Sequence, residues 1–152
     1  MNHEYFMERA LQESYKALDE GEVPIGAVIV RNGKVIGRGY NRTEQLKDAT
    51  GHAEIIAISS ASSLSESWRL NGSTLYVTLE PCLMCLGAIL LTRLDSIIYG
   101  SPDPRIGAIE SHSYHQTASK AYDSFPECMG GVLEYPCKDI LQQFFKKMRK
   151  KN

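Results

Sequence analysis

Apolar and polar positions recur along this chain with two different periods, and each period predicts one kind of element. Residues 3–21 place apolar side chains at helical spacing and end at a glycine, which predicts a first helix. Residues 24–41 contain two β-rich runs on either side of Asn32-Gly33, a dipeptide that favours a tight hairpin turn. The N-terminal part of the chain therefore predicts a helix followed by two antiparallel strands.

The rest of the chain alternates between helical and strand-like segments. The pattern predicts helices over 52–64, 81–93 and 137–151, and strands over 73–80, 95–100 and 130–135. Pro81 suits the first turn of the second of these helices. The segment 101–129 is polar and irregular, with a short helix expected near 115–125. This order predicts an α/β fold, a three-layer α-β-α sandwich around a mixed five-stranded sheet.

Length and composition are those of an ordinary globular domain. The 152 residues are predicted to form a single domain, residues 1–152, and 43% are hydrophobic. No apolar stretch approaches the roughly 18 residues of a membrane span. The first residues carry acids and lack a cationic start followed by an apolar block, so they do not resemble a secretory signal. We therefore expect a cytoplasmic protein without membrane contact.

Charge is distributed unevenly between the two ends of the chain. The formal net charge of −1 excludes a uniformly basic nucleic-acid binder. Residues 135–152, however, hold six cations and one acid. This basic end, on the predicted helix 137–151, could contact a polyanion or could be a solvated helix end whose cations complement the helix dipole. Charge alone leaves both interpretations open.

Two of the four cysteines form a pair with metal-ligand spacing. Cys82 and Cys85 are expected to share one side of a helix's first turn, where free N–H groups favour thiolates. Such pairs also occur as redox motifs or as two small buried residues. His52 favours a metal, because two thiolates and one imidazole supply three of the four tetrahedral zinc ligands and leave one position for water. The other histidine and cysteine candidates, His112, His115, Cys128 and Cys137, are expected to be surface or core residues instead.

Glu54 lies two residues after His52, a spacing that suits a shared task only at the entrance of a helix. A carboxylate beside a metal-activated water can take a proton and return it to a leaving group. The alternative is an acid that stabilises a helix N-terminus. Together with His52 and the cysteine pair, the position of Glu54 favours the proton-carrying role.

The residues "HAE" and "PCLMC" match the H-x-E and P-C-x-x-C signature of zinc-dependent nucleobase deaminases. Further segments, "EVPIGAVIV", "GYNRTE", "SWRLNGSTLYVTLEPCLMC" and "FFKKMRK", resemble the bacterial tRNA adenosine deaminases, which convert the wobble adenosine of an anticodon to inosine. The similarity runs from about Met7 to Leu94 and returns in the last helix.

This resemblance implies a cytidine-deaminase-like fold, a homodimer, and one Zn²⁺ per subunit with an activated water as fourth ligand. It implies that His52, Cys82 and Cys85 bind the zinc and that Glu54 is the proton shuttle. It also implies contacts with the tRNA anticodon stem-loop. The implied substrate-binding residues are Asn41, the backbone N–H of Ala53, Asp103, Phe145, Lys147 and Arg149.

The sequence departs from this family after Gly107, where the expected Gly-Ser-Leu continuation is missing. The departure concerns the segment 105–130, whose effect on RNA recognition the sequence does not determine. Two other functions remain open: a free nucleobase deaminase acting on guanine or cytosine, and an inactive zinc-stabilised RNA-binding module. The basic helix argues against the first and Glu54 against the second.

Overall fold

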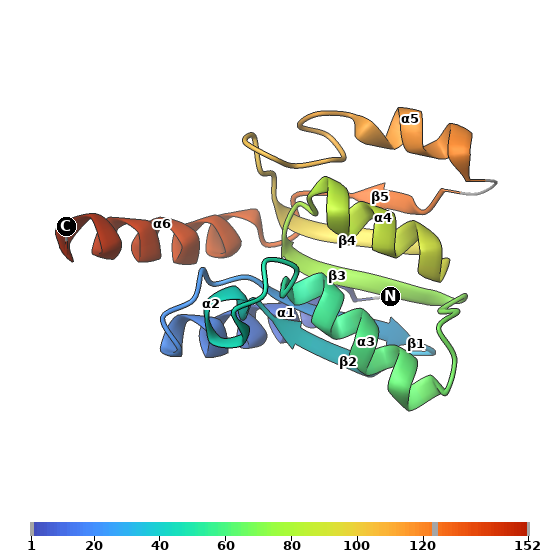
Figure 1. Ribbon diagram of the computed structural model, residues 1–152, viewed down its shortest axis with the longest axis horizontal. Helices are drawn as coiled ribbons and strands as arrows, with labels where there is room; N and C mark the ends of the chain where they lie inside the picture. The colour runs from blue at the N-terminus through green and yellow to red at the C-terminus, as the bar shows by residue number, and fades with distance from the viewer. Residues whose placement is uncertain (1, 123–124, 152) are drawn as a thin grey trace.

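The computed structural model describes residues 2–122 and 125–151, and Figure 1 shows their arrangement. The helices are α1 (His3–Asp19), α2 (Thr43–Leu46), α3 (Ala53–Ser65), α4 (Leu83–Thr92), α5 (Tyr114–Ala121) and α6 (Glu134–Lys151). The strands are β1 (Gly26–Arg31), β2 (Lys34–Tyr40), β3 (Ser73–Leu79), β4 (Ser96–Ser101) and β5 (Glu127–Met129).

The strands form one mixed sheet in the order β2-β1-β3-β4-β5. β1 pairs antiparallel with both β2 and β3, whereas β3–β4 and β4–β5 are parallel. The hairpin predicted at Asn32-Gly33 joins β1 to β2, and both turn residues have positive φ, as such a turn requires. The predicted five-stranded mixed sheet is confirmed.

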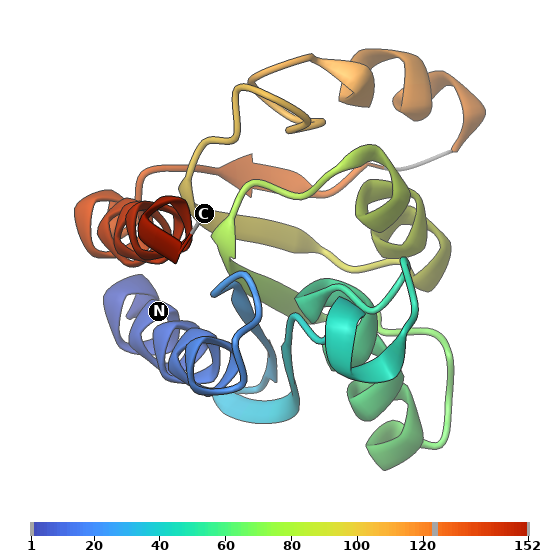
Figure 2. The same ribbon diagram turned by 60° about the vertical axis from the view of Figure 1, so that its left-hand side comes forward.

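Helices cover both faces of the sheet. Along β1, Ala27 and Ile29 pack with α3 and α4 on one face, while Val28 and Val30 pack with α1 and α6 on the other. Figure 2 shows α1 and α6 on one side of the sheet and α3 and α4 on the opposite side. Successive strand residues therefore contribute to two separate apolar layers, which confirms the predicted α-β-α sandwich.

Two glycines let α3 approach β2 closely. A Cβ atom at Gly37 would lie 2.5 Å from the carbonyl oxygen of Ala57, and one at Gly39 would lie 2.3 Å from that of Ala53. Any larger residue at Gly39 would push away the first turn of α3. These glycines thus help to set the position of the helix that begins beside His52.

The last predicted strand was placed wrongly. We expected a strand over 130–135, but β5 is Glu127–Met129, paired with Ser96–Ile98 of β4. Gly131 and Leu133 both have positive φ, so the chain turns here and leaves the sheet. α6 then begins at Glu134, three residues before the predicted start.

Two further boundaries differ from the prediction. Pro81 precedes α4 rather than beginning it, because its carbonyl accepts a hydrogen bond from the N–H of Ala108 and Cys82 pairs with Gly107 in an isolated bridge. These pairings keep Pro81 and Cys82 extended, so α4 starts at Leu83. The four-residue helix α2 was not predicted.

The short helix expected near 115–125 is confirmed as α5, Tyr114–Ala121. Residues 123–124 of that prediction lie outside the described residues. Among the helices that the structure describes, none combines the length and the apolar content that crossing a membrane requires.

Candidate active site

Two helix N-termini on the same face of the sheet carry the predicted metal and proton groups. His52 is the N-cap residue of α3, and Glu54 lies in the first turn of that helix. Cys82 is the N-cap residue of α4, and Cys85 follows one turn later. Neither N-cap side chain makes a capping hydrogen bond, although this position usually holds Ser, Thr, Asp or Asn for that purpose. Both side chains are therefore available to the site.

The three predicted ligands meet at distances that fit a zinc ion. The Nδ1 atom of His52 lies 3.7 Å from Sγ of Cys82 and 3.5 Å from Sγ of Cys85. In a tetrahedral site with Zn–S near 2.3 Å and Zn–N near 2.05 Å, nitrogen and sulfur ligands lie about 3.6 Å apart. In the part of the chain that the structure describes, these three residues are the one cluster of histidine, cysteine and acidic side chains that could hold a metal.

The other histidines and cysteines have different partners. His112 and His115 hydrogen-bond to backbone carbonyl oxygens, and Cys137 is buried in the core beside α1. Cys128 is exposed on β5. None of them joins the three-ligand cluster, as the sequence predicted.

The cysteine pair favours a thiolate at Cys82. Hydrogen bonds from the thiol of Cys85 and from His52 lower the pKa of Cys82 to about 4, against the opposing effect of burial. As the donor to that sulfur, and because it is buried, Cys85 has a raised pKa. The hydrogen bond with Cys82 also raises the pKa of His52, and the nearby carboxylate of Glu54 adds to this effect. The cluster thus carries the negative charge that attracts a divalent cation.

Glu54 is 4% exposed and lies beside this cluster. Burial, together with the negative charge of Cys82, raises its pKa to about 7. A carboxyl group with such a pKa can both accept and release a proton near neutral pH. This is the property that a proton shuttle needs.

A cavity of about 770 Å³ opens beside His52. Its walls come from six segments: the residues before β1, the residues from the end of β2 to α2, the start of α3, the end of β3, the end of β4 with the loop after it, and one face of α6. The lining residues are Val23, Ile25, Asn41, Thr43, His52, Ala53, Leu79, Ser101, Pro102, Asp103, Pro104, Arg105, Ile106, Lys138, Leu141, Gln142 and Phe145.

Three of the predicted substrate contacts line this cavity near His52. Asn41 is buried; its Nδ2 donates to the carbonyl oxygen of Val23 at 3.2 Å, while its Oδ1 is buried and has no hydrogen-bond partner among the residues that the structure describes. Ala53 is the first residue of α3, so no preceding helical carbonyl faces its N–H. Asp103 uses its carboxylate within its own loop, where Oδ1 accepts from the backbone N–H groups of Arg105 and Ile106.

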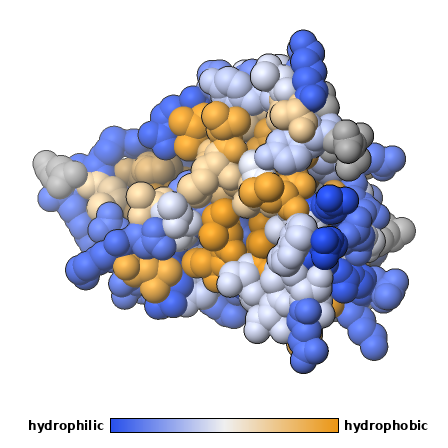
Figure 3. All heavy atoms as spheres, turned by 45° about the vertical axis from the view of Figure 1, so that its right-hand side comes forward, coloured by the Kyte–Doolittle hydropathy of each residue, from blue (hydrophilic) through white to orange (hydrophobic). Residues whose placement is uncertain are grey.

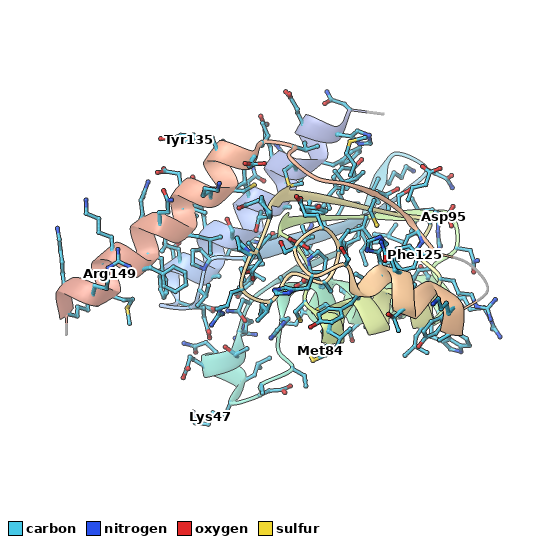
Figure 4. All side chains as sticks on the ribbon, turned by 90° about the horizontal axis from the view of Figure 1, so that it is seen from above. Lys47, Met84, Asp95, Phe125, Tyr135 and Arg149 are labelled. Carbon is cyan, nitrogen blue, oxygen red and sulfur yellow. The ribbon has the colours of Figure 1, made fainter. Side chains whose placement is uncertain are left out.

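The predicted contacts on α6 divide into two groups. Phe145 lines the cavity and is 44% exposed, whereas its neighbour Phe144 is buried, as expected for adjacent residues on a helix. Lys147 and Arg149 are exposed and lie beyond the cavity, and Figure 4 shows Arg149 near the free end of α6. The structure therefore brings only Phe145 of this group to the cavity.

Several lining residues were not predicted from the sequence. One face of α6 lines the cavity with Lys138, Leu141, Gln142 and Phe145; the last three lie three, four and seven residues after Lys138. That helical spacing is a signal that could have identified them. Glu80 accepts hydrogen bonds from backbone N–H groups of the loop after β4. No sequence pattern indicated this role, because backbone donors are present at almost every residue and the loop has no regular spacing of apolar positions. Burial alone would raise the pKa of Glu80, but hydrogen bonds from Ser111 and from backbone N–H groups lower it below the usual value.

Comparisons with known proteins agree with this geometry. Residues 1–101 match the family model of the cytidine and deoxycytidylate deaminase zinc-binding region. A tRNA-specific adenosine deaminase of Bacillus subtilis is 41% identical over 148 residues, which cover 97% of this chain and 91% of that protein.

Two solved structures extend the comparison to the fold. One comes from a study of A-to-I editing by tRNA:A34 deaminases at the wobble position of transfer RNA; it is 43% identical, with a TM-score of 0.84, over 90% of this chain and 98% of that chain. The other is a guanine deaminase of Bacillus subtilis, 35% identical with a TM-score of 0.64, over 80% of this chain and 70% of that chain.

Proposed function

Because the chain belongs to the tRNA-specific adenosine deaminases within the cytidine and deoxycytidylate deaminase family, we propose that it converts the wobble adenosine of a tRNA anticodon to inosine. The reaction is hydrolytic: water replaces the exocyclic amine, which leaves as ammonia. One observation carries the proposal. His52, Cys82 and Cys85 lie at zinc-ligand distances beside a buried glutamate, where the cavity opens.

His52, Cys82 and Cys85 would hold one Zn²⁺ per subunit, in line with the spacing of their ligand atoms. Zinc with three protein ligands leaves its fourth position for a water and lowers the pKa of that water towards neutrality. The positive N-terminal ends of α3 and α4 add to the stabilisation of the negative ligands.

Glu54 carries the protons of the reaction. Its carboxylate accepts one proton from the attacking water and passes it to the ring nitrogen of adenine; it then accepts the remaining proton of the new hydroxyl group and delivers it to the departing amine. Its burial supports this role, because a pKa raised to about 7 keeps both protonation states accessible. Burial also keeps bulk water from exchanging the proton during the reaction.

Asn41 and Ala53 would orient the flipped base. The unpaired Oδ1 of Asn41 can accept a hydrogen bond from the base or its ribose, and its Nδ2 already holds the side chain against Val23. The N–H of Ala53 is a donor at the start of α3, beside His52. Asp103 would contact the same nucleotide from the loop after β4, which also lines the cavity.

The end of α6 would contact the anticodon stem-loop beyond the flipped base. Phe145 offers an exposed ring at the cavity, where an unstacked base can pack. Lys147 and Arg149 follow on the exposed part of the helix, where they can pair with phosphates. Together they extend the site from one nucleotide to an RNA loop.

We also infer a homodimer. Apolar side chains gather near the middle of one face of the molecule, with hydrophilic residues around them (Figure 3). The exposed apolar residues include Leu83, Met84 and Leu91 of α4, and Met84 points outward in Figure 4. Contact with a second copy would bury such a patch.

The whole chain acts in this proposal as a single zinc-dependent deaminase domain. Because its substrate is tRNA, we propose that it works in the cytoplasm.

The alternative function is deamination of a free base, which the similarity to a guanine deaminase supports. The C-terminal helix favours RNA, because one face of α6 forms a wall of the cavity and its basic end continues past it. Incubating the zinc-loaded protein with an anticodon stem-loop, guanine, cytosine and adenosine separates the two functions. We expect inosine in the RNA and no ammonia from guanine or cytosine; the opposite result would refute the proposal.

A further inference from the structure

A second buried glutamate lies beside the cavity without joining the zinc cluster. Glu80 follows β3 and is 2% exposed. Its carboxylate accepts hydrogen bonds from the backbone N–H groups of Asp103 at 2.9 Å, Ile109 at 2.8 Å and Ser111 at 3.1 Å. The hydroxyl of Ser111 donates a fourth at 2.5 Å. None of the ion pairs between described residues involves Glu80, so these hydrogen bonds are what stabilise its buried charge.

The loop from Asp103 to Ser111 curls around this carboxylate. Gly107 packs so closely against it that a Cβ atom there would lie 2.3 Å from a carboxylate oxygen of Glu80. The first part of the same loop, residues 103–106, forms one wall of the cavity. The side chain of Glu80 is not among the lining residues, and it acts on the cavity only through the backbone that it holds.

His112 holds the same wall from the outside. Its Nε2 atom lies 2.9 Å from the carbonyl oxygen of Pro104 and 3.0 Å from that of Arg105. Both partners are acceptors, so Nε2 carries the proton and donates to them. The imidazole also stacks on Tyr114, with ring centroids 5.9 Å apart and planes tilted by 18°. This ring contact limits the orientations of the donor.

We propose that Glu80 and His112 are positioning residues that set the shape of the cavity wall 103–106 and thereby the affinity of the site for RNA. The inference rests on the proposed function for its substrate. Glu80 fixes the two ends of the loop through N–H groups, and His112 fixes the cavity wall near the start of the loop through the carbonyl groups of Pro104 and Arg105. His112 lies in the segment 105–130, where the continuation expected for the family is missing.

Glu80→Gln tests the inner anchor. The amide keeps the size of the side chain but points one N–H₂ group at backbone donors, which breaks part of the bonding. For an anticodon stem-loop we expect KM to rise at least fivefold and kcat to stay within twofold, with unchanged zinc content. Glu110→Gln is the matched control, because Glu110 lies on the same loop but accepts its hydrogen bond from Tyr99. The control should keep the wild-type KM.

Three substitutions test the outer anchor. Glutamine can place its amide nitrogen near the position of Nε2, whereas asparagine is too short and alanine has no donor. His112→Gln should therefore keep KM near the wild-type value, while His112→Asn and His112→Ala should raise it at least threefold. Equal KM values for all three variants and the wild type would overturn the role of His112.

Amide hydrogen exchange provides a test that does not depend on activity. The N–H groups of Asp103, Ile109 and Ser111 should exchange at least tenfold faster in Glu80→Gln than in the wild type or in Glu110→Gln. If the wild type forms no inosine, the proposed function fails and this measurement alone decides whether Glu80 anchors the wall. Active variants with unchanged KM and unchanged exchange would overturn the inference. A smaller amount of active protein with an unchanged KM would also overturn the inference, because that result is expected if Glu80 only stabilises the fold.

Discussion

His52 and Cys82 occupy the N-cap positions of α3 and α4, and Nδ1 of the histidine lies 3.7 Å from Sγ of the cysteine. At ordinary helices, N-cap side chains bond to the N–H groups of the first turn, and losing that bond costs about 0.5–2 kcal/mol. Here both side chains point to each other instead. Both helices therefore lack the stabilising hydrogen bond of an N-cap side chain. A cation bound between His52 and Cys82 would offset this loss of stability.

The first prediction concerns the metal. Cys82→Ala should bind no zinc tightly and should lose at least a thousandfold in activity, because two ligands cannot hold the ion in a catalytic geometry. Zinc should also raise the Tm of the wild type but not that of the variant. Metal analysis and thermal unfolding check this, and Cys128→Ala, which removes an exposed thiol outside the cluster, should behave as the wild type does. A zinc-loaded, active Cys82→Ala protein would contradict the ligand assignment.

The second prediction separates proton transfer from metal binding. Glu54→Gln should keep the fold and the zinc but lower kcat by about 10²–10⁴-fold, the usual contribution of general acid–base catalysis. Glutamine has nearly the same size as glutamate, and Glu54 is not one of the three zinc ligands, so the substitution should leave zinc binding intact. Single-turnover kinetics with an anticodon stem-loop, beside a zinc assay, measure both effects. A kcat equal to the wild type would end the shuttle role of Glu54.

Patterns within single segments predicted most of the fold. The Asn32-Gly33 hairpin, the helix after His52 and the sheet of five strands followed from periodicity and turn chemistry, which are local properties. The prediction of a strand at 130–135 was wrong, because these residues form a turn and the first residues of α6. Whether such residues pair with β4 depends on a partner strand distant in sequence, and the pattern does not contain that information.

The metal cluster was predictable for a different reason. Few kinds of site combine a histidine, a glutamate and a cysteine pair at these spacings, so the residue types themselves indicated a catalytic zinc site. The family resemblance, and not residue chemistry, predicted Asn41, Ala53, Asp103 and Phe145 at the cavity. Glu80 was missed, because it acts through backbone groups and an ordinary glutamate before a proline has no distinctive pattern.

Asn41 provides the third prediction. Asn41→Ala should weaken kcat/KM for the stem-loop by about 2- to 12-fold, corresponding to one hydrogen bond of about 0.5–1.5 kcal/mol to the substrate. The zinc content should not change, because Asn41 is not a member of the ligand cluster. Steady-state kinetics measure the loss. An unchanged kcat/KM would show that the free Oδ1 does not meet the substrate.

The fourth prediction concerns the approach of α3 to β2. Gly39→Ala should destabilise the protein by about 1–3 kcal/mol, because the added methyl group meets the carbonyl oxygen of Ala53 and the helix must shift. Ser60→Ala, on the exposed side of α3, should change stability by less than about 0.5 kcal/mol. Urea unfolding compares the two. Equal stability of both variants would show that α3 does not depend on this close packing.

The last prediction concerns the basic end of α6. Removing the residues after Phe145 should weaken RNA binding and flatten its dependence on salt, since fewer phosphates are neutralised. Each lost phosphate contact changes the slope of log K against log[salt] by about 0.7–0.9, so Lys147→Ala and Arg149→Ala together should lower it by up to about 1.8. Lys34→Ala, an exposed cation at the β1–β2 turn, should leave the slope unchanged. If the truncated protein keeps the wild-type slope, the cations at this end only solvate a helix terminus, and the RNA must be held by the cavity and Phe145 alone.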